Sequence, residues 1–180
     1  MDSRRRDYPL ESWWLPTLVV APSSIHGQGV FTRKAISVGT VVIRWGGVLF
    51  TDADMKAGKV RQHTYVGIGN GLYLANPLEK APSLDDFMNH SCDSNLWMTD
   101  EITLVPRRPI SAGSELTADY AMWLNLPDYR LKTACNCGSP FCRHGITGLD
   151  WQLPEVQIRY AGHFSPFINT LIINHKPQMQ

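Results

Sequence analysis

The sequence predicts a single mainly β domain that is followed by a C-terminal helix. From 18–49, short apolar runs rich in β-branched residues are separated by glycines, which is typical of short strands. In 64–74, the triplet Gly69-Asn70-Gly71 lies between two apolar arms and predicts a hairpin turn. The segments 102–110 and 114–123 are two further expected strands. Since no repeat or linker interrupts the pattern, we expect residues 17–146 to form one β unit.

Length and composition support a globular domain and exclude several other classes. The chain has 180 residues, of which 43% are hydrophobic and 18% charged, so it is long enough to bury a core. The formal net charge of +1 gives no strong field that would hold the protein on nucleic acid or an anionic membrane. No apolar run approaches the roughly 18 residues of a membrane-spanning helix, and Pro16 interrupts the run over 13–21. We therefore expect a soluble, intracellular protein that binds neither membranes nor nucleic acid directly.

The two ends of the chain differ from the β unit. Residues 1–16 combine charge, tryptophan and proline without periodicity and predict an irregular extension, in which Arg4 to Arg6 form a solvated run. Near the other end, Ser165 is placed as an N-cap with Pro166 at the first helical position. The residues that recur there at helical spacing are Phe164, Phe167, Ile168, Leu171 and Ile172. We expect this helix to pack on its own domain, and a homodimer through the helix is the alternative.

The four cysteines are unevenly placed. Cys92 is isolated, whereas Cys135, Cys137 and Cys142 lie within eight residues in the segment CNCGSPFC. Three thiolates around a tight loop and a fourth upstream suit a tetrahedral zinc site with four sulfur ligands. Unrelated reduced cysteines and two disulfides are the alternatives. His90, two residues before Cys92, is a weaker ligand candidate than the four sulfurs.

A set of ordered motifs indicates the family. The triplet Gly27-Gln28-Gly29 lacks the third glycine and the helix of a dinucleotide-binding loop, which argues against NAD. It is followed in order by Asn89-His90-Ser91-Cys92, by the segment 113–120 (GSELTADY) and by CNCGSPFC. With these motifs, the chain resembles a SET-domain protein lysine methyltransferase with a post-SET zinc loop.

The resemblance implies a fold and a division of the chain. The expected fold is mainly β and of the SET-domain type (β-clip-like and knotted), with short helices, a zinc-bound post-SET loop and a C-terminal helix. The N-terminal extension would cover 1–16, the SET domain 17–123, the post-SET loop 134–148 and a helical extension 149–180. The segments around residues 89–92 and 115–120 would meet in a knot-like crossing. S-adenosylmethionine would lie on one side of that crossing and a peptide groove on the other, joined by a narrow channel.

The resemblance also assigns roles to individual residues. Tyr120 would be the catalytic residue, with its hydroxyl at the end of the channel. Residues that would contact S-adenosylmethionine are Gly27, Gln28, Gly29, Tyr65, Asn89, His90 and Asn136, with Tyr65 matched only loosely. Structural zinc would be held by Cys92, Cys135, Cys137 and Cys142.

Two positions depart from the family pattern. Asp86 stands where arginine is common, and no role follows for it from the sequence. Ala118 stands where an aromatic residue is common, which would leave space in the substrate channel for di- and trimethyl-lysine. Tyr65, Trp97 or Trp123 could fill that space instead, since cores seldom leave voids.

The expected activity is the transfer of methyl groups from S-adenosylmethionine to lysine side chains of a protein substrate, a histone or another basic protein. One alternative is a catalytically silent, zinc-stabilised SET-fold binding module. A nucleic-acid binder that uses Arg4 to Arg6 and Arg107-Arg108 lacks interleaved aromatic residues. A hydrolase built on His90-Ser91 lacks a nucleophile-elbow pattern.

Overall fold

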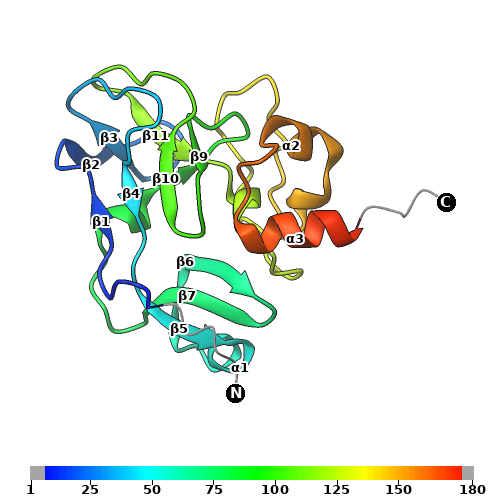
Figure 1. Cartoon of the computed structure of the whole chain (residues 1–180). Coiled ribbons are helices and arrows are strands. Elements are labelled where there is room, and N and C mark those ends of the chain that lie inside the picture. The colour runs from blue at the N-terminus through cyan, green and yellow to red at the C-terminus, as the bar shows by residue number, and fades with distance from the viewer. Residues whose placement is uncertain (1–6, 176–180) are drawn as a thin grey trace.

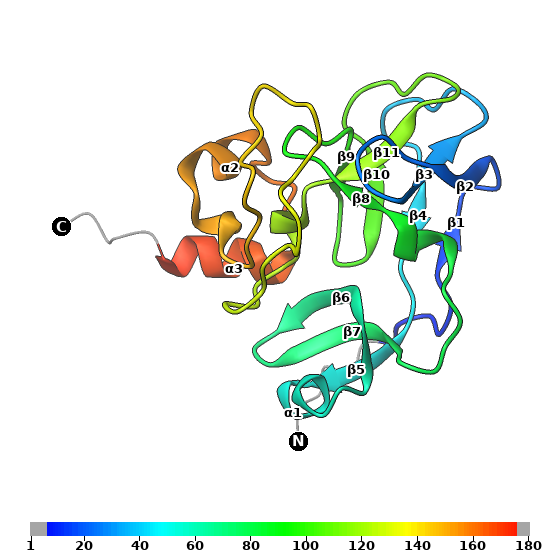
Figure 2. The same ribbon diagram turned by 180° about the vertical axis from the view of Figure 1, so that it is seen from behind.

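The computed structural model describes residues 7–175, apart from the side chains of residues 62 and 63. Three small sheets form the β part of the chain, as the sequence predicts (Figures 1 and 2). The arginine run over residues 4–6 lies outside the described residues. None of the described helices is long and apolar enough to cross a membrane.

The first sheet has the order β1-β4-β10-β9. Its strands are β1 (Trp13–Trp14), β4 (Ile43–Arg44), β10 (Thr103–Pro106) and β9 (Leu96–Met98). The segment before residue 17 is therefore not irregular throughout, because Trp13 and Trp14 pair with Arg44 and Ile43.

The second sheet has the order β2-β3-β11-β8 and carries most of the family motifs. Its strands are β2 (Leu18–Pro22), β3 (Gln28–Thr32), β11 (Glu115–Ala118) and β8 (Asn89–His90). Strand β11 is shorter than the segment 114–123 that the sequence indicated. It ends because the Asp119 carboxylate accepts a hydrogen bond from the Ala121 amide at 3.1 Å and so begins the 3-10 helix η2 (Tyr120–Met122).

The third sheet has the order β5-β7-β6 and lies apart from the other two at the bottom of Figure 1. Strands β6 (Val60–Gly69) and β7 (Leu72–Pro77) form the expected hairpin, and β5 (Val48–Thr51) pairs with β7. Gly71 has a φ of 61°, which is the left-handed conformation that this turn requires. Helix α1 (Asp52–Lys56) follows β5, and the 3-10 helix η1 (Leu84–Phe87) precedes β8.

The C-terminal segment packs on its own domain. It contains η3 (Asp150–Gln152), α2 (Pro154–Arg159) and α3 (Pro166–His175). Ser165 caps α3 as expected, because its hydroxyl accepts the Ile168 amide at 3.2 Å. Phe164 and Ile168 are buried in the main core, so the apolar stripe of α3 faces the β domain.

Strands β3, β8 and β11 of the second sheet meet at Gly29, where the Glu115 and Asn89 side chains pack against its backbone. A Cβ atom on Gly29 would collide with the Glu115 carboxylate and lie 3.1 Å from Asn89 Nδ2. That carboxylate cannot move freely, because it accepts hydrogen bonds from Asn89 Nδ2 at 2.8 Å and from Ser23 Oγ at 2.8 Å. Only glycine fits at this position without a shift of its neighbours.

We predict that Gly29→Ala lowers the free energy of unfolding by about 1–3 kcal/mol, the usual cost of overpacking. Denaturant unfolding measures the change. Gly145→Ala is the matched control, because a Cβ there meets nothing within 4 Å, and its effect should stay within about 0.5 kcal/mol. Equal stability of the two variants would contradict the packing argument.

Candidate functional site

The candidate site is built where β8 and β11 run side by side in parallel. Asn89 pairs with Thr117, and His90 pairs with Ala118. The motif after residue 88 and the motif before Tyr120 are thereby brought together, as expected. Because β11 leads directly into η2, Tyr120 lies at the end of this paired segment.

A cavity of about 520 Å³ opens beside this strand pair. Most of the residues that the sequence assigned to a cofactor line it: Gly27, Gln28, Asn89, His90 and Asn136. Tyr120 lines it too. Gly29 and Tyr65 do not, since Gly29 is buried against Glu115 and Tyr65 faces two smaller cavities.

The Asn89 side chain lines the cavity and also makes hydrogen bonds within the protein. Its Nδ2 donates to the carbonyls of His26 at 3.1 Å and Gln28 at 3.0 Å, and to the Glu115 carboxylate at 2.8 Å. These bonds fix the turn of residues 26–28 on the cavity. Asn136 reaches the same turn from the other side, where its Nδ2 donates to the Ser24 carbonyl at 3.4 Å.

His90 connects the cysteine cluster with Tyr120. Its Nδ1 accepts the Tyr120 backbone amide at 3.3 Å, which leaves Nε2 to carry the proton toward Cys92 Sγ at 3.3 Å. Burial lowers the pKa of His90 to about 4, although Asp119 opposes the shift. The ring is therefore neutral at pH 7, and the 3.8 Å approach to Asp119 is not an ion pair.

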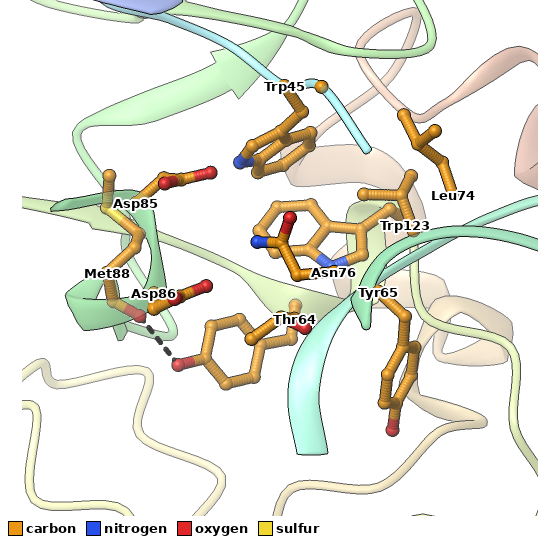
Figure 3. A pocket seen from close by; sticks show the side chains of 12 residues that line it. Trp45, Thr64, Tyr65, Leu74, Asn76, Asp85, Asp86, Met88 and Trp123 are labelled. Carbon is orange, nitrogen blue, oxygen red and sulfur yellow. Dashed lines mark hydrogen bonds between the residues drawn. The ribbon is translucent and has the colours of Figure 1, made fainter. Parts of the chain in front are cut away.

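Tyr120 lines all three cavities. Its hydroxyl donates to the Met88 carbonyl at 2.8 Å (Figure 3). Burial raises the pKa of Tyr120, so the hydroxyl stays protonated at neutral pH. Its oxygen lone pairs remain free to accept a hydrogen bond from a ligand.

Aromatic side chains form the walls of the two smaller cavities. One, lined by Tyr65, Tyr120, Trp123, Leu124 and Tyr129, has a volume of about 20 Å³, and the other has a volume of about 60 Å³. Tyr65 and Trp123 line both of them. The family resemblance implied that Tyr65 contacts the cofactor. In the structure, Tyr65 lines the two smaller cavities together with Tyr120 and Trp123 and does not line the large cavity.

Ala118 lies in the core and lines none of the three cavities. The Trp123 ring lies beside Tyr120, with centroids 5.7 Å apart. Trp97 instead stacks on His163 at 3.4 Å, away from these cavities. Of the three candidate aromatics, Trp123 and Tyr65 thus share cavities with Tyr120 and Trp97 does not.

The four cysteines gather in one cluster, and all are free of disulfides. Their sulfur atoms lie within 4.8 Å of one another. A zinc–sulfur distance of about 2.3 Å gives sulfur–sulfur edges of about 3.8 Å in a tetrahedron, so a small contraction of the cluster would fit zinc. Burial raises the pKa of Cys92 to about 12, whereas hydrogen bonds overcome burial and lower the pKa of Cys137 to about 7. The donor set fits a structural zinc ion.

Arg143 ties this loop to the strand pair, although no sequence motif singles it out. Its guanidinium makes two hydrogen bonds to the Asp119 carboxylate at 2.8 and 2.9 Å, and a third to Asp150 at 2.9 Å. Asp119 is fully buried. The backbone amide of Arg143 also donates to Cys92 Sγ at 3.3 Å. In the sequence, Arg143 directly follows Cys142 and Asp119 directly precedes Tyr120. Neither position predicts that Arg143 and Asp119 form an ion pair.

Comparison with known proteins agrees with this geometry. The sequence model of the SET domain matches residues 27–121, a little over half of the chain. The human protein named histone-lysine N-methyltransferase 2B is 30% identical over 136 residues, which are 67% of this chain and 5% of that protein. Histone-lysine N-methyltransferase ash1 of Drosophila melanogaster is 28% identical over 152 residues, covering 76% of this chain and 7% of that protein. The chain therefore spans only a small part of these relatives.

Two solved structures share the fold. Arabidopsis thaliana SUVH6, crystallised in complex with SAM, superposes with a TM-score of 0.58 at 20% identity, over 71% of this chain and 32% of the other. KRYPTONITE, crystallised with mCHG DNA and SAH, gives a TM-score of 0.55 at 26% identity, over 71% of this chain and 28% of the other. The family model matches more than half of the chain, and the paired motifs lie beside the large cavity. The chain therefore belongs to the SET domain family.

Proposed function

We propose that the protein is a lysine methyltransferase that uses S-adenosylmethionine to methylate a protein substrate. The observation that carries the proposal is the position of Tyr120, whose side chain lines the 520 Å³ cavity and both smaller cavities and whose hydroxyl donates to the Met88 carbonyl. A cofactor in the large cavity and a lysine in an aromatic cavity would meet at this hydroxyl. The relatives named as histone-lysine methyltransferases support a basic protein as the substrate class.

The residues of the large cavity fit S-adenosylmethionine. The exposed turn of Gly27 and Gln28 offers backbone groups, and Asn136 of the cysteine loop closes the opposite wall. Asn89 and His90 would hold this wall rigid, because their side chains are already bonded within the protein. When bound, S-adenosylmethionine supplies an electrophilic methyl group on a positively charged sulfur.

The chain must receive the lysine as a neutral amine. With a lysine pKa of about 10.4, removal of the proton at pH 7 costs about 4–5 kcal/mol. The aromatic walls around Tyr65, Trp123 and Tyr129 would lower this cost by excluding water from the amine. Because the Tyr120 hydroxyl donates to Met88, its oxygen would accept an N–H of the amine and aim the nitrogen lone pair at the methyl carbon.

Zinc at the four cysteines would be structural. It would tie the loop that carries Cys135, Cys137 and Cys142 to Cys92, and so hold Asn136 against the large cavity. The metal would have no contact with the reacting groups. Its effect on activity would come through the position of the loop.

The first prediction tests the reaction. Purified protein with labelled S-adenosylmethionine should methylate lysines in histones, ribosomal proteins or lysate proteins, identified by mass spectrometry. Tyr120→Phe should lower turnover by about 10²-fold or more while leaving S-adenosylhomocysteine affinity within about twofold. Tyr73→Phe, the same change at a tyrosine that lines none of the three cavities, is the control and should retain activity. Full turnover of Tyr120→Phe on the cognate substrate would show that the role assigned to Tyr120 is wrong.

The second prediction concerns the metal. Freshly purified protein should contain one zinc per chain, and Cys137→Ser should lose it, whereas Ser139→Ala in the same loop should retain it. Zinc retention should fall with decreasing pH, because thiolates must be deprotonated to bind the metal. Chelation should increase hydrogen exchange in residues 134–148 before the β core unfolds. A zinc-free active protein, or disulfides among these cysteines, would overturn the assignment.

The third prediction concerns the product. Each added methyl needs space beside the nitrogen, and Ala118 adds no bulk near Tyr120, so di- and trimethyl-lysine should accumulate. A time course on the substrate, followed by mass, measures this directly. Ala118→Tyr should stop the reaction earlier, and its folding is checked by circular dichroism because Ala118 is fully buried. If the parent protein stops at one methyl, Trp123 rather than Ala118 determines the space available.

A further inference from the structure

The cavity of about 60 Å³ has an unusual chemical character (Figure 3). Rings of Trp45 and Trp123 form part of its wall, and their centroids are 4.8 Å apart. The polar side chains that line it include Asp85, Asp86 and Asn76. The cavity thus combines aromatic surfaces with hydrogen-bond acceptors, which suits an organic cation.

The two carboxylates are fixed by the protein. Asp85 accepts hydroxyl hydrogen bonds from Ser12 and Ser83, both at 2.6 Å. Asp86 accepts the Ser83 backbone amide at 2.9 Å and so caps η1, and it also makes a side-chain hydrogen bond with Asn76. Each carboxylate has four lone-pair sites, so these bonds leave acceptor capacity for a further donor.

Asn76 provides an independent indication of a missing ligand. It is 96% buried, since only 4% of its surface is exposed, yet its Oδ1 has no hydrogen-bond partner. In Figure 3 its amide lies in front of the Trp123 ring, with the nitrogen on the side of the two aspartates and the oxygen on the side of Trp45. A buried acceptor without a donor is costly, so a ligand that donates here would remove that cost.

Among the side chains that the structure describes, Arg61 is a cation that acts on the Asp86 carboxyl and lowers its pKa. No ion pair joins Arg61 to either carboxylate, because its Nη2 donates to the Leu78 carbonyl at 3.3 Å. The Arg61 Nε is buried without a hydrogen-bond partner. Burial raises the pKa of Asp86, as expected for a carboxyl that lacks a close cationic partner.

The size of the cavity selects among cations. A volume of about 60 Å³ is about four to six times the roughly 10–15 Å³ that one water requires. A guanidinium group has four heavy atoms, is planar, and carries several N–H donors in fixed directions. It would lie along an indole ring and donate to Asp86 and Asn76 together, which the compact head of a lysine does less well.

We propose that this cavity, hereafter the guanidinium pocket, binds the side chain of an arginine of the protein substrate. The inference rests on the proposed function and names a feature of its substrate. Asp86, Met88 and Tyr120 line both the guanidinium pocket and the large cavity. An arginine bound there lies close to the lysine at Tyr120, so the two basic residues belong to one short stretch of substrate.

The test measures binding without methyl transfer, so a failure of the proposed activity does not affect it. The indole N–H signals of Trp45 and Trp123 are followed by NMR while Nα-acetyl-arginine methylamide is added. The citrulline analogue has the same shape without the charge, so it serves as the control ligand for the unchanged protein. Arginine should shift both signals at concentrations where citrulline does not.

Asp86→Asn should weaken the arginine compound about tenfold, because it removes one charge-assisted hydrogen bond while retaining the acceptor that caps η1. Glu79→Gln, an exposed acidic residue outside the pocket, should leave binding unchanged. Equal binding of citrulline, or stronger binding of Nα-acetyl-lysine methylamide, would overturn the proposal. Once a substrate peptide is known, replacement of its arginine by citrulline should raise KM much more than it lowers kcat.

Discussion

The arrangement of the site depends on one buried ion pair, between Arg143 and Asp119. Asp119 is fully buried and directly precedes Tyr120, whereas Arg143 directly follows Cys142. The pair has bidentate geometry at 2.8 and 2.9 Å, which gives direction as well as attraction. Asp119 also begins η2 and thereby sets where Tyr120 leaves β11. A single contact thus connects the cysteine loop with the residue that we place at the reacting groups.

This connection explains why the loop and the strand pair act as one unit. His90 bonds to the Tyr120 amide on one side and to Cys92 on the other, so its neutral ring is a second link between the same two parts. The wall of the large cavity includes both the turn at Gly27 and the loop residue Asn136, and it exists only while the loop is docked. Since loops are the mobile part of most domains, the ion pair and a metal at the cysteines restrict the motion that would open the cavity. Cofactor binding and the environment of Tyr120 are expected to change together.

The sequence predicted the mainly β fold, the 64–74 hairpin, the cap at Ser165 and the gathering of the four cysteines, because these depend on local patterns or on a distinctive motif set. It did not predict the very short strands β1, β8 and β9, since two or three residues carry no periodicity and are ordered only by their partners. It gave no account of Arg143, because an ion pair between residues 24 positions apart has no signature in either segment. The position of Tyr65 and the gathering of Asn76, Asp85 and Asp86 at one cavity likewise depend on contacts between segments far apart in the sequence, which only the folded chain shows.

The central claim is that the Arg143–Asp119 pair joins the cysteine loop to the paired strands β8 and β11. A double-mutant cycle with Arg143→Met and Asp119→Asn tests it most directly, with the free energy of unfolding measured for all four proteins at equal zinc content. Each single change leaves a buried group without its partner and should cost about 3–5 kcal/mol. The double variant should cost less than the sum of the two by about 1–3 kcal/mol. Additive single effects, with a coupling energy near zero, would contradict the claim.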